Sequence, residues 1–267
     1  MRISSLLVCL AVLSADGAFA GTRIAAETRR LDREGSAEQV TLHIDGERLR
    51  FDGGDGRSSI IYRGDRPLVW IVDHRDKKYM EVNRGTTAAL DKANSMIRDG
   101  MKGLPPERRA ALESLLGGAQ AQVAAGPKIT VRPTGERDLV GGRTCDEQEV
   151  LRGQERVALV CTASLASLGM PADSLSAVPG LVAFAREAFE SLAAIAPGVV
   201  DRQAIDALGS LANVEGLPVR ARVFDKGKPV AETVVTEVAQ EASEGSRFEV
   251  PDGYRGGFSL GNLDLGS

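Results

Sequence analysis

Apolar and polar residues alternate in the first third of the chain, as is typical of strands. Val40, Leu42 and Ile44 are separated by polar residues, so they lie on one face of a strand. Similar segments follow, each ending at a short polar turn: Ser58–Arg63, Pro67–Asp73 and Lys77–Asn83. Strands joined by short turns pair antiparallel, so these residues predict an antiparallel meander.

Two details refine this meander. Asp45-Gly46 predicts a two-residue hairpin turn, which places Leu42 opposite Leu49 and Val40 opposite Phe51. The segment Leu68–Val72 is apolar on both faces. A strand of this kind is typical of the centre of a sheet with both sides covered, so we predict that position for it.

The apolar spacing changes to three and four residues in two later stretches, which predicts helices. The first stretch holds one helix around residues 90–101 and a second that begins at Pro105-Pro106 and ends near Gly117-Gly118. The second stretch covers residues 179–195 and 201–213. Large apolar side chains on these four helices are Leu90, Ile97, Met101, Leu112, Leu116, Leu181, Phe184, Leu192, Ile205 and Leu208.

Further strands are predicted near residues 128–133, on both sides of Gly153, and at 219–224, 229–239 and 248–250. We find no internal repeat and no linker between domains. The sequence therefore predicts an α+β protein with a single curved antiparallel sheet and helical inserts that cover the concave face. This domain spans residues 21–255, and residues 256–267 form a flexible glycine-rich tail.

The first twenty residues have the pattern of a cleavable signal peptide. Arg2 precedes a short apolar run, Leu6–Leu13, and Ala18-Phe19-Ala20 supplies small residues where a signal peptidase cuts. The run is shorter than the about 20 residues that span a bilayer. We expect cleavage after Ala20 and a periplasmic protein that is not an integral membrane protein.

Cysteine usage agrees with export. Loss of Cys9 with the signal peptide leaves Cys145 and Cys161, an even number, which favours a disulfide in an oxidising compartment. Both lie at equal distance from Gly153, so a hairpin turn there places them opposite each other at ~4.5 to 5.5 Å between Cα atoms. A redox switch is less favoured because the chain has no C-x-x-C motif.

Composition narrows the function. The 267 residues include 33 Lys and Arg against 37 Asp and Glu, a net charge of -4, which excludes a general nucleic-acid binder. Aromatic residues make up only 4% of the chain, so the core is mainly aliphatic and few rings are available for stacking on bases or sugars.

Candidate catalytic and metal sites have simpler interpretations. Gly257–Gly261 matches G-x-S-x-G, but only six residues follow it, so no catalytic histidine comes after the serine. His43 and His74 are expected on solvated surface, on a polar strand face and in a charged turn. Asp52–Gly56 lacks the ligand pattern of an EF-hand, and a hairpin loop is favoured. We therefore expect no enzyme activity, no cofactor and no metal site.

The remaining feature is the pair of apolar helical inserts within one meander. If both lie on the same face of a curved sheet, they enclose an apolar hollow for a ligand such as a lipid or an acylated peptide. An acyl chain gains about 0.8 kcal/mol per buried CH₂. The residues expected to line this hollow are Trp70, Leu90, Ile97, Met101, Leu112, Leu116, Leu181, Phe184 and Leu192. An equally favoured interpretation is that these side chains only close a core.

Several short motifs, in this order along most of the mature chain, resemble bacterial domain-of-unknown-function family 4412: Ser58–Asp65, Asp76–Met80, Leu104–Arg109, the pair Cys145 and Cys161, Gly216–Val219 and Val250–Tyr254. That family is similar to the LolA/LolB-like envelope proteins, so the resemblance implies an incomplete antiparallel β-barrel with helices over its open side. The helix before Leu104 has only Met96 and Met101, fewer methionines than the family pattern, and no lipoprotein-binding residue carries over.

Together these features favour a non-enzymatic periplasmic protein that binds an apolar ligand between sheet and helices. The alternative is an envelope interaction or sensor module, in which a sheet edge or the helical hairpin docks a partner protein without a small ligand.

Overall fold

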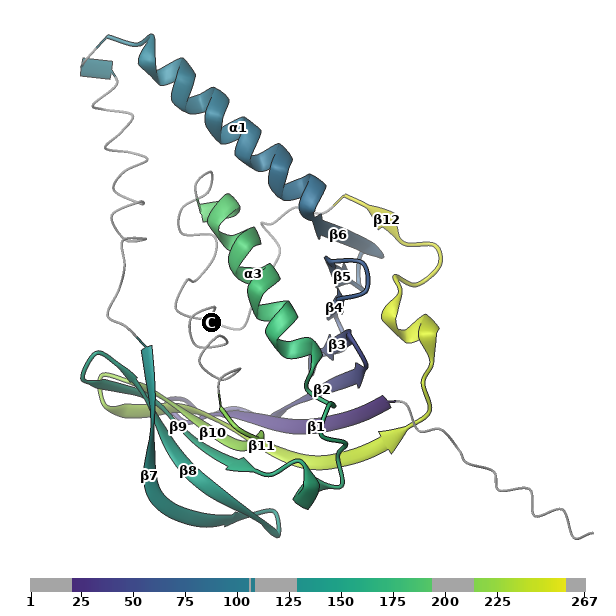
Figure 1. Cartoon of the computed structure of the whole chain (residues 1–267), viewed down its shortest axis with the longest axis vertical. Coiled ribbons are helices and arrows are strands. Elements are labelled where there is room, and N and C mark those ends of the chain that lie inside the picture. Colours follow the sequence, from purple (N-terminus) through teal and green to yellow (C-terminus); the bar gives the residue numbers. More distant parts are fainter. Residues whose placement is uncertain (1–20, 106, 109–128, 194–213, 258–267) are drawn as a thin grey trace, which may run out of the picture.

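A computed structural model describes residues 21–105, 107–108, 129–193 and 214–257. Its strands form one curved sheet of twelve (Figure 1). They are β1 (Gly21–Arg30), β2 (Glu38–Asp45), β3 (Arg48–Asp52), β4 (Ser58–Arg63), β5 (Leu68–Asp73), β6 (Lys78–Asn83), β7 (Ile129–Val140), β8 (Arg143–Arg152), β9 (Glu155–Ala163), β10 (Leu217–Asp225), β11 (Lys228–Glu241) and β12 (Arg255–Gly256). No helix among the described residues is long and apolar enough to cross a membrane.

The sheet consists of two antiparallel meanders joined along one pair of strands. The first runs from β1 to β6 and the second from β7 to β11, and β1 pairs with β11 between them. Among the described strands, only the short β12 pairs in parallel, with β6. The predicted antiparallel sheet is therefore confirmed, whereas β1, which joins the two halves, was not predicted.

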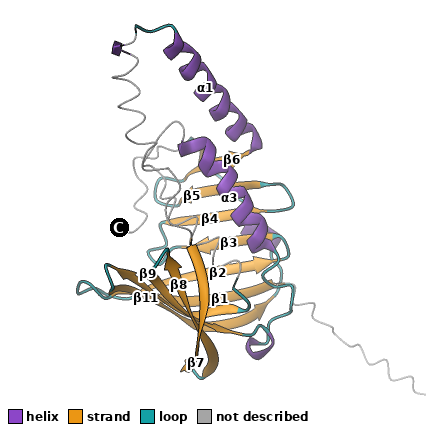
Figure 2. Ribbon diagram, turned by 60° about the vertical axis from the view of Figure 1, so that its left-hand side comes forward, coloured by secondary structure: helices purple, strands orange, loops and turns teal. Residues whose placement is uncertain are grey.

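The two long helices of the described residues follow different strands. Helix α1 (Arg84–Lys102) begins directly after β6, where the Asn83 side chain accepts a hydrogen bond from the Thr86 amide at 2.9 Å and so caps the helix. Helix α3 (Ala177–Ala193) follows the short 3₁₀ helix η1 (Ala166–Leu168) and lies in the hollow of the sheet (Figure 2). The second helix of each predicted pair falls mostly on residues outside the described ranges.

Helix α3 packs on one side of the first meander, which we call the inner face. The Phe184 ring lies 6.2 Å from the ring of Tyr62 on β4. The buried inner core includes side chains from both meanders: Ile24, Ile44, Leu49, Tyr62, Val82, Val140, Cys145, Cys161, Phe184, Ala188, Leu217, Val219 and Val235.

A second, smaller core lies on the opposite side of β4 and β5, which we call the outer face. It contains Ile61, Trp70, Val72 and Phe248. Phe248, only 2% exposed, belongs to residues 243–257, which we call the C-terminal strap. In Figure 1 the strap runs along the first meander from β11 to β12. Strand β5 is thus apolar on both faces because the strap covers one of them, although β5 is third from the sheet edge rather than central.

Two predictions for the strap need correction. Residues 248–250 were predicted as a strand, but the strap forms a 3₁₀ helix, η2 (Gly245–Phe248), which turns Phe248 into the outer core. The flexible tail was predicted to begin at Gly256. Gly256 instead belongs to β12 and pairs with Tyr79 of β6, and the Gly257 amide donates a hydrogen bond to the Tyr79 carbonyl at 3.1 Å.

The disulfide is confirmed, with a different register from the one predicted. Cys145 and Cys161 are bonded, with Cα atoms 5.3 Å apart. Cys161 lies opposite Glu147 rather than Cys145, because the turn holds two residues, Gly153 and Gln154, and a bulge at Val150/Leu151 shifts β8 against β9 by one more residue. The two cysteines are therefore diagonal neighbours.

We expect Cys145→Ser to lower the melting temperature of the oxidised protein. The bond closes a loop with a sequence separation of 16, and a loop of this size contributes roughly 3 kcal/mol by restricting the unfolded chain. Thermal unfolding followed by circular dichroism checks this. In a reductant that opens the bond, the difference between the two proteins should shrink; a difference of the same size there contradicts this account.

Candidate functional site

Five apolar side chains form a row across the inner face of the first meander. Each lies opposite the next on a neighbouring strand, and we call this row the apolar strip: Leu42 on β2, Phe51 on β3, Ile60 on β4, Ile71 on β5 and Met80 on β6. Ile60 and Tyr62 are two residues apart on β4, so the strip faces the same side as the inner core.

The strip is bounded by a row of a different kind on each side. Toward α3, the next row contains Leu49, Tyr62 and Val82, which are all buried in the inner core. On the other side, the next row contains Asp73 and Lys78, which lie opposite each other at the β5–β6 turn. The Asp73 carboxylate accepts hydrogen bonds from the amides of residues 75 and 76 within that turn. From β4 to β6 the strip is therefore one side chain wide.

The middle of the strip is the least covered part. Phe51 is 39% exposed, and Ile60 and Ile71 are half-buried. None of these three packs against the inner or the outer core of the described residues, whereas Leu42 and Met80 at the two ends contact the inner core. Within the part of the chain that the structure describes, these three side chains form an apolar surface outside both cores, which makes them a candidate binding surface.

The residues predicted to line the hollow are divided among several places. Phe184 is buried in the inner core and Leu181 packs against it, both on α3. Trp70 lies in the outer core, on the opposite side of the sheet from Phe184. Leu90, Ile97 and Met101 belong to α1 and Leu192 to α3, and the structure describes only their backbone. Leu112 and Leu116 lie outside the described residues.

Sequence reasoning did not select any of the five strip residues for binding. Leu42 and Phe51 were assigned to the apolar face of the first hairpin, and no binding role was predicted for Ile60, Ile71 or Met80. The signal that finds them is the strand alternation combined with the hairpin register, which aligns residues from five strands in one row.

The outer face carries a polar cluster that resembles a catalytic group in composition only. The Ser59 Oγ lies 2.6 Å from the His74 Nε2 and also bonds to the Asp52 carboxylate. In a catalytic triad the carboxylate orients the histidine, but here it contacts the serine. Ser59 is 1% exposed, and Tyr254 of the strap bonds to His74 Nδ1 at 2.9 Å. This cluster is therefore a partly buried link between sheet and strap.

His43 is held in a similar way, which corrects the prediction of solvated histidines. Its Nδ1 lies 2.7 Å from the Glu241 carboxylate and 2.9 Å from the guanidinium of Arg247 in the strap. The side chain is 12% exposed. Sequence patterns placed His43 on a polar strand face and His74 in a turn. They did not reveal that a segment distant in the sequence covers each of them.

The strap is also fixed by ion pairs. Arg63 of β4 pairs with Glu249 and with Asp65, and Arg66 pairs with Glu249 at 2.7 Å. The Arg63 pairing lowers the pKa of Asp65 to about 2. The Arg48 guanidinium lies 5.1 Å from the centre of the Phe248 ring. Charged groups thus surround the apolar anchor of the strap.

Comparisons with known proteins add a distant likeness. No family model matches the sequence, and neither does any curated protein. Among solved structures, the complex of Pseudomonas aeruginosa MucA/MucB has a TM-score of 0.39 at 12% identity, covering 86% of this chain and 56% of that one. A crystal structure of MucB has a TM-score of 0.37 at 12% identity, covering 87% and 58%. PNGF-II has a TM-score of 0.36 at 6% identity, covering 86% and 30%. The chain spans only about half the length of the MucB chains, and no residue role is carried over.

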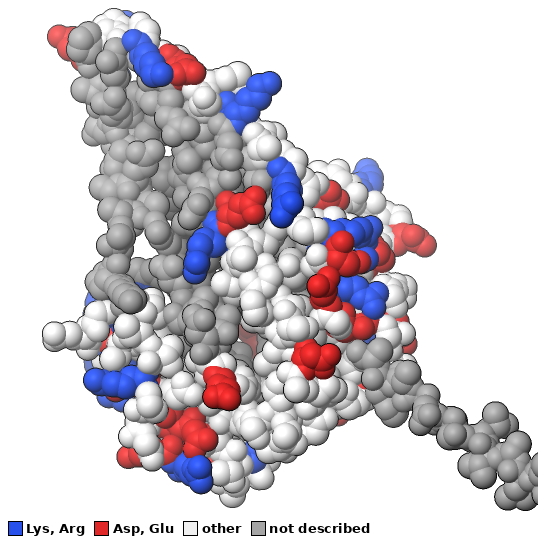
Figure 3. Space-filling view, viewed as in Figure 1, with Lys and Arg blue, Asp and Glu red and all other residues white. Residues whose placement is uncertain are grey.

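Charge on the described surface is mixed. On the face drawn in Figure 3, Lys and Arg are interspersed with Asp and Glu around a broad uncharged area. This face has no single-sign patch of the kind that steers nucleic acid to a protein.

We expect mild acid to destabilise the wild-type protein more than His74→Gln. The pKa of His74 lies below its usual value because burial disfavours the charged form and Arg50 is near, while Asp52 and Asp73 act in the opposite direction. Below the unfolded-state pKa of about 6.5, His74 binds more protons in the unfolded chain than in the folded protein. The free energy of unfolding therefore decreases as the pH decreases. Glutamine does not titrate and removes this contribution.

Urea unfolding at several pH values between 7.5 and 5 checks this expectation. The free energies of unfolding of the two proteins should differ least at low pH, where wild type has lost the His74 contribution. A difference that stays constant over this range contradicts the role of His74.

Proposed function

We propose that this protein is a non-enzymatic periplasmic binding protein that holds the apolar chain of a lipid or an acylated peptide between sheet and helices. The observation that carries the proposal is the apolar strip, in particular Phe51, Ile60 and Ile71, which lie side by side outside both cores. In this function the helical inserts cover the concave face and close the strip from above.

The dimensions of the strip favour a single linear chain. Its five strands span four gaps of about 4.8 Å, or about 19 Å, while its width is one row of residues, about 7 Å. A helix with its side chains is about 10 Å across, so it does not fit between the buried row and the polar row. An extended acyl chain lying across the strands matches both dimensions.

Energetics are consistent with useful affinity. Ten buried CH₂ groups contribute about 8 kcal/mol of transfer free energy. Association and ordering remove several kcal/mol of this, which leaves binding that is reversible. The buried disulfide supports an oxidising compartment, and the resemblance to family 4412 also supports a periplasmic location.

We expect Ile60→Asp to weaken uptake of a fluorescent fatty acid at least tenfold. The bound acyl chain would bury the new carboxylate in the middle of the strip without a hydrogen-bond partner, which costs free energy of binding. Val223→Asp is the matched control, since Val223 is an exposed apolar side chain on β10, outside the strip. Fluorescence titration of the purified proteins, with circular dichroism to verify folding, measures the effect. Equal binding by both variants overturns the assignment of the strip.

The alternative, a module that docks a partner protein, is favoured by one observation. Helix α1 extends from β6 beyond the sheet (Figure 1), and Met96 on it is 61% exposed. An exposed apolar side chain on a projecting helix is suited to contact another protein.

A photo-crosslinking amino acid at position 96, introduced in cells, distinguishes the two functions. If the alternative holds, crosslinking traps one defined protein and native mass spectrometry of the purified chain shows no lipid. Under the leading proposal, lipid accompanies the purified protein and the same crosslinker gives no defined adduct.

A further inference from the structure

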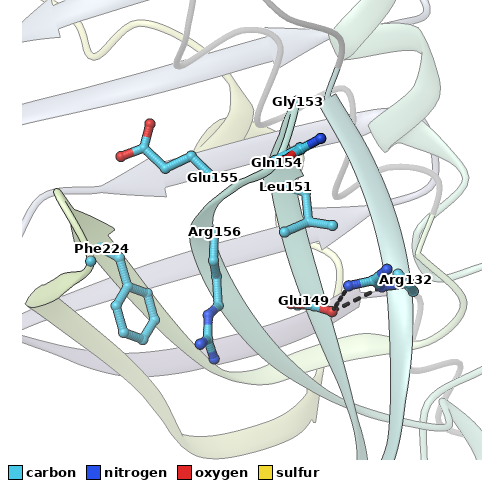
Figure 4. Close-up of a pocket in the computed structure, with 9 residues that line it drawn as sticks. Arg132, Glu149, Leu151, Gly153, Gln154, Glu155, Arg156 and Phe224 are labelled. Atoms are coloured by element: carbon cyan, nitrogen blue, oxygen red, sulfur yellow. Dashed lines mark hydrogen bonds and ion pairs between the residues drawn. The ribbon is translucent and has the colours of Figure 1, made fainter.

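A pocket of about 640 Å³ lies on the second meander, separated from the apolar strip by β1 and β11. It is formed between the tips of the β8–β9 and β10–β11 hairpins (Figure 4). Its lining residues are Arg132, Glu149, Leu151, Gly153, Gln154, Glu155, Arg156, Phe224 and Gly227. Gly153 and Gly227 have positive φ angles of 62° and 76°, which allow both tips to turn tightly beside the pocket.

The two arginines of the pocket differ in their partners. Arg132 is committed to Glu149 on the neighbouring strand, with bonds of 2.6 and 2.9 Å to one carboxylate oxygen. The charges of Arg132 and Glu149 neutralise each other, and the two side chains form one wall of the pocket. Figure 4 shows Leu151 between this pair and Arg156. Arg156 lies directly opposite Leu151 in the strand register.

Arg156 lies over an aromatic ring and has no acceptor among the described residues. Its guanidinium carbon lies 5.3 Å from the centre of the Phe224 ring. It makes no hydrogen bond or ion pair with any residue that the structure describes. The neighbouring Glu155 points away from it in Figure 4, as expected for adjacent residues of a strand. The guanidinium lies over the ring, and its N–H donors have no partner among the described residues.

We propose that this pocket binds a small organic carboxylate that carries an apolar group. A stacked guanidinium offers a planar fork of donors that matches a carboxylate with two parallel hydrogen bonds. Leu151 and the Phe224 ring supply an apolar contact for the rest of the ligand. Glu149 and Glu155 keep the lining close to neutral, so a monoanion is favoured over a polyanion. This site is separate from the apolar strip and does not depend on it.

The test uses phenylacetate as the probe and the full mature chain as the protein. NMR titration should shift the backbone amides of Gly153, Gln154 and Gly227, with a Kd on the order of 1 mM, as expected for a ligand of this size. Arg156→Gln should weaken binding about tenfold or more, because it removes a charge-assisted pair. Arg156→Lys keeps the charge without the fork and should bind with intermediate affinity.

Two controls make the test decisive. Arg137→Gln changes an exposed arginine of β7 that pairs with Asp146 outside the pocket, and it should bind like wild type. Benzyl alcohol, which has the ring without the charge, should bind much more weakly. Wild-type affinity in Arg156→Gln, equal binding of the alcohol, or no shift at the hairpin tips overturns the proposal.

Discussion

The pairing of β1 with β11 is the interaction on which the architecture depends. Each meander forms from strands that are neighbours in sequence, but the two become one sheet only because the first and eleventh strands exchange backbone hydrogen bonds. Thr22 and Gln240, which bond through their side chains, are 218 residues apart. Closing so long a loop costs conformational entropy, but this cost increases only slowly with loop length. Burial of the inner core, which is built from both meanders, offsets the cost.

The two faces of this sheet are covered by different kinds of segment. On the inner face, α3 covers one row of side chains, and the middle of the adjacent row, the apolar strip, lies outside the core. On the outer face, the C-terminal strap covers a small apolar cluster and surrounds it with histidines and ion pairs. The difference between the faces follows from what covers them: a helix contacts a narrow stripe, whereas an irregular segment follows the surface.

Local patterns were sufficient to predict much of this fold. The strands β4 to β6 and the disulfide follow from alternation, turns and cysteine count. The first hairpin was predicted with its turn at Asp45-Gly46, but Asp45 pairs with Arg48, so the turn is Gly46-Glu47. The register is shifted by two residues, and an even shift keeps every side chain on its predicted face. This is why the apolar face was right although the partners were not.

Features that depend on distant segments were not predictable in this way. Trp70 was placed with the helices because β5 is apolar on both faces, and alternation does not say which neighbour covers which face. The same limit applied to the two histidines, which are covered by residues about 200 positions away in the case of His43. The pocket beside Arg156 was not predicted either, because a single arginine opposite a leucine does not form a recognisable sequence motif.

The strap has a consequence for how the chain is made. Synthesis proceeds from the N-terminus, so the first meander leaves the ribosome long before the residues that complete its outer core. Until Phe248 arrives, Ile61, Trp70 and Val72 have no cover on that side. A chain that ends before Phe248 therefore lacks the apolar anchor of the strap on the outer side of β4 and β5.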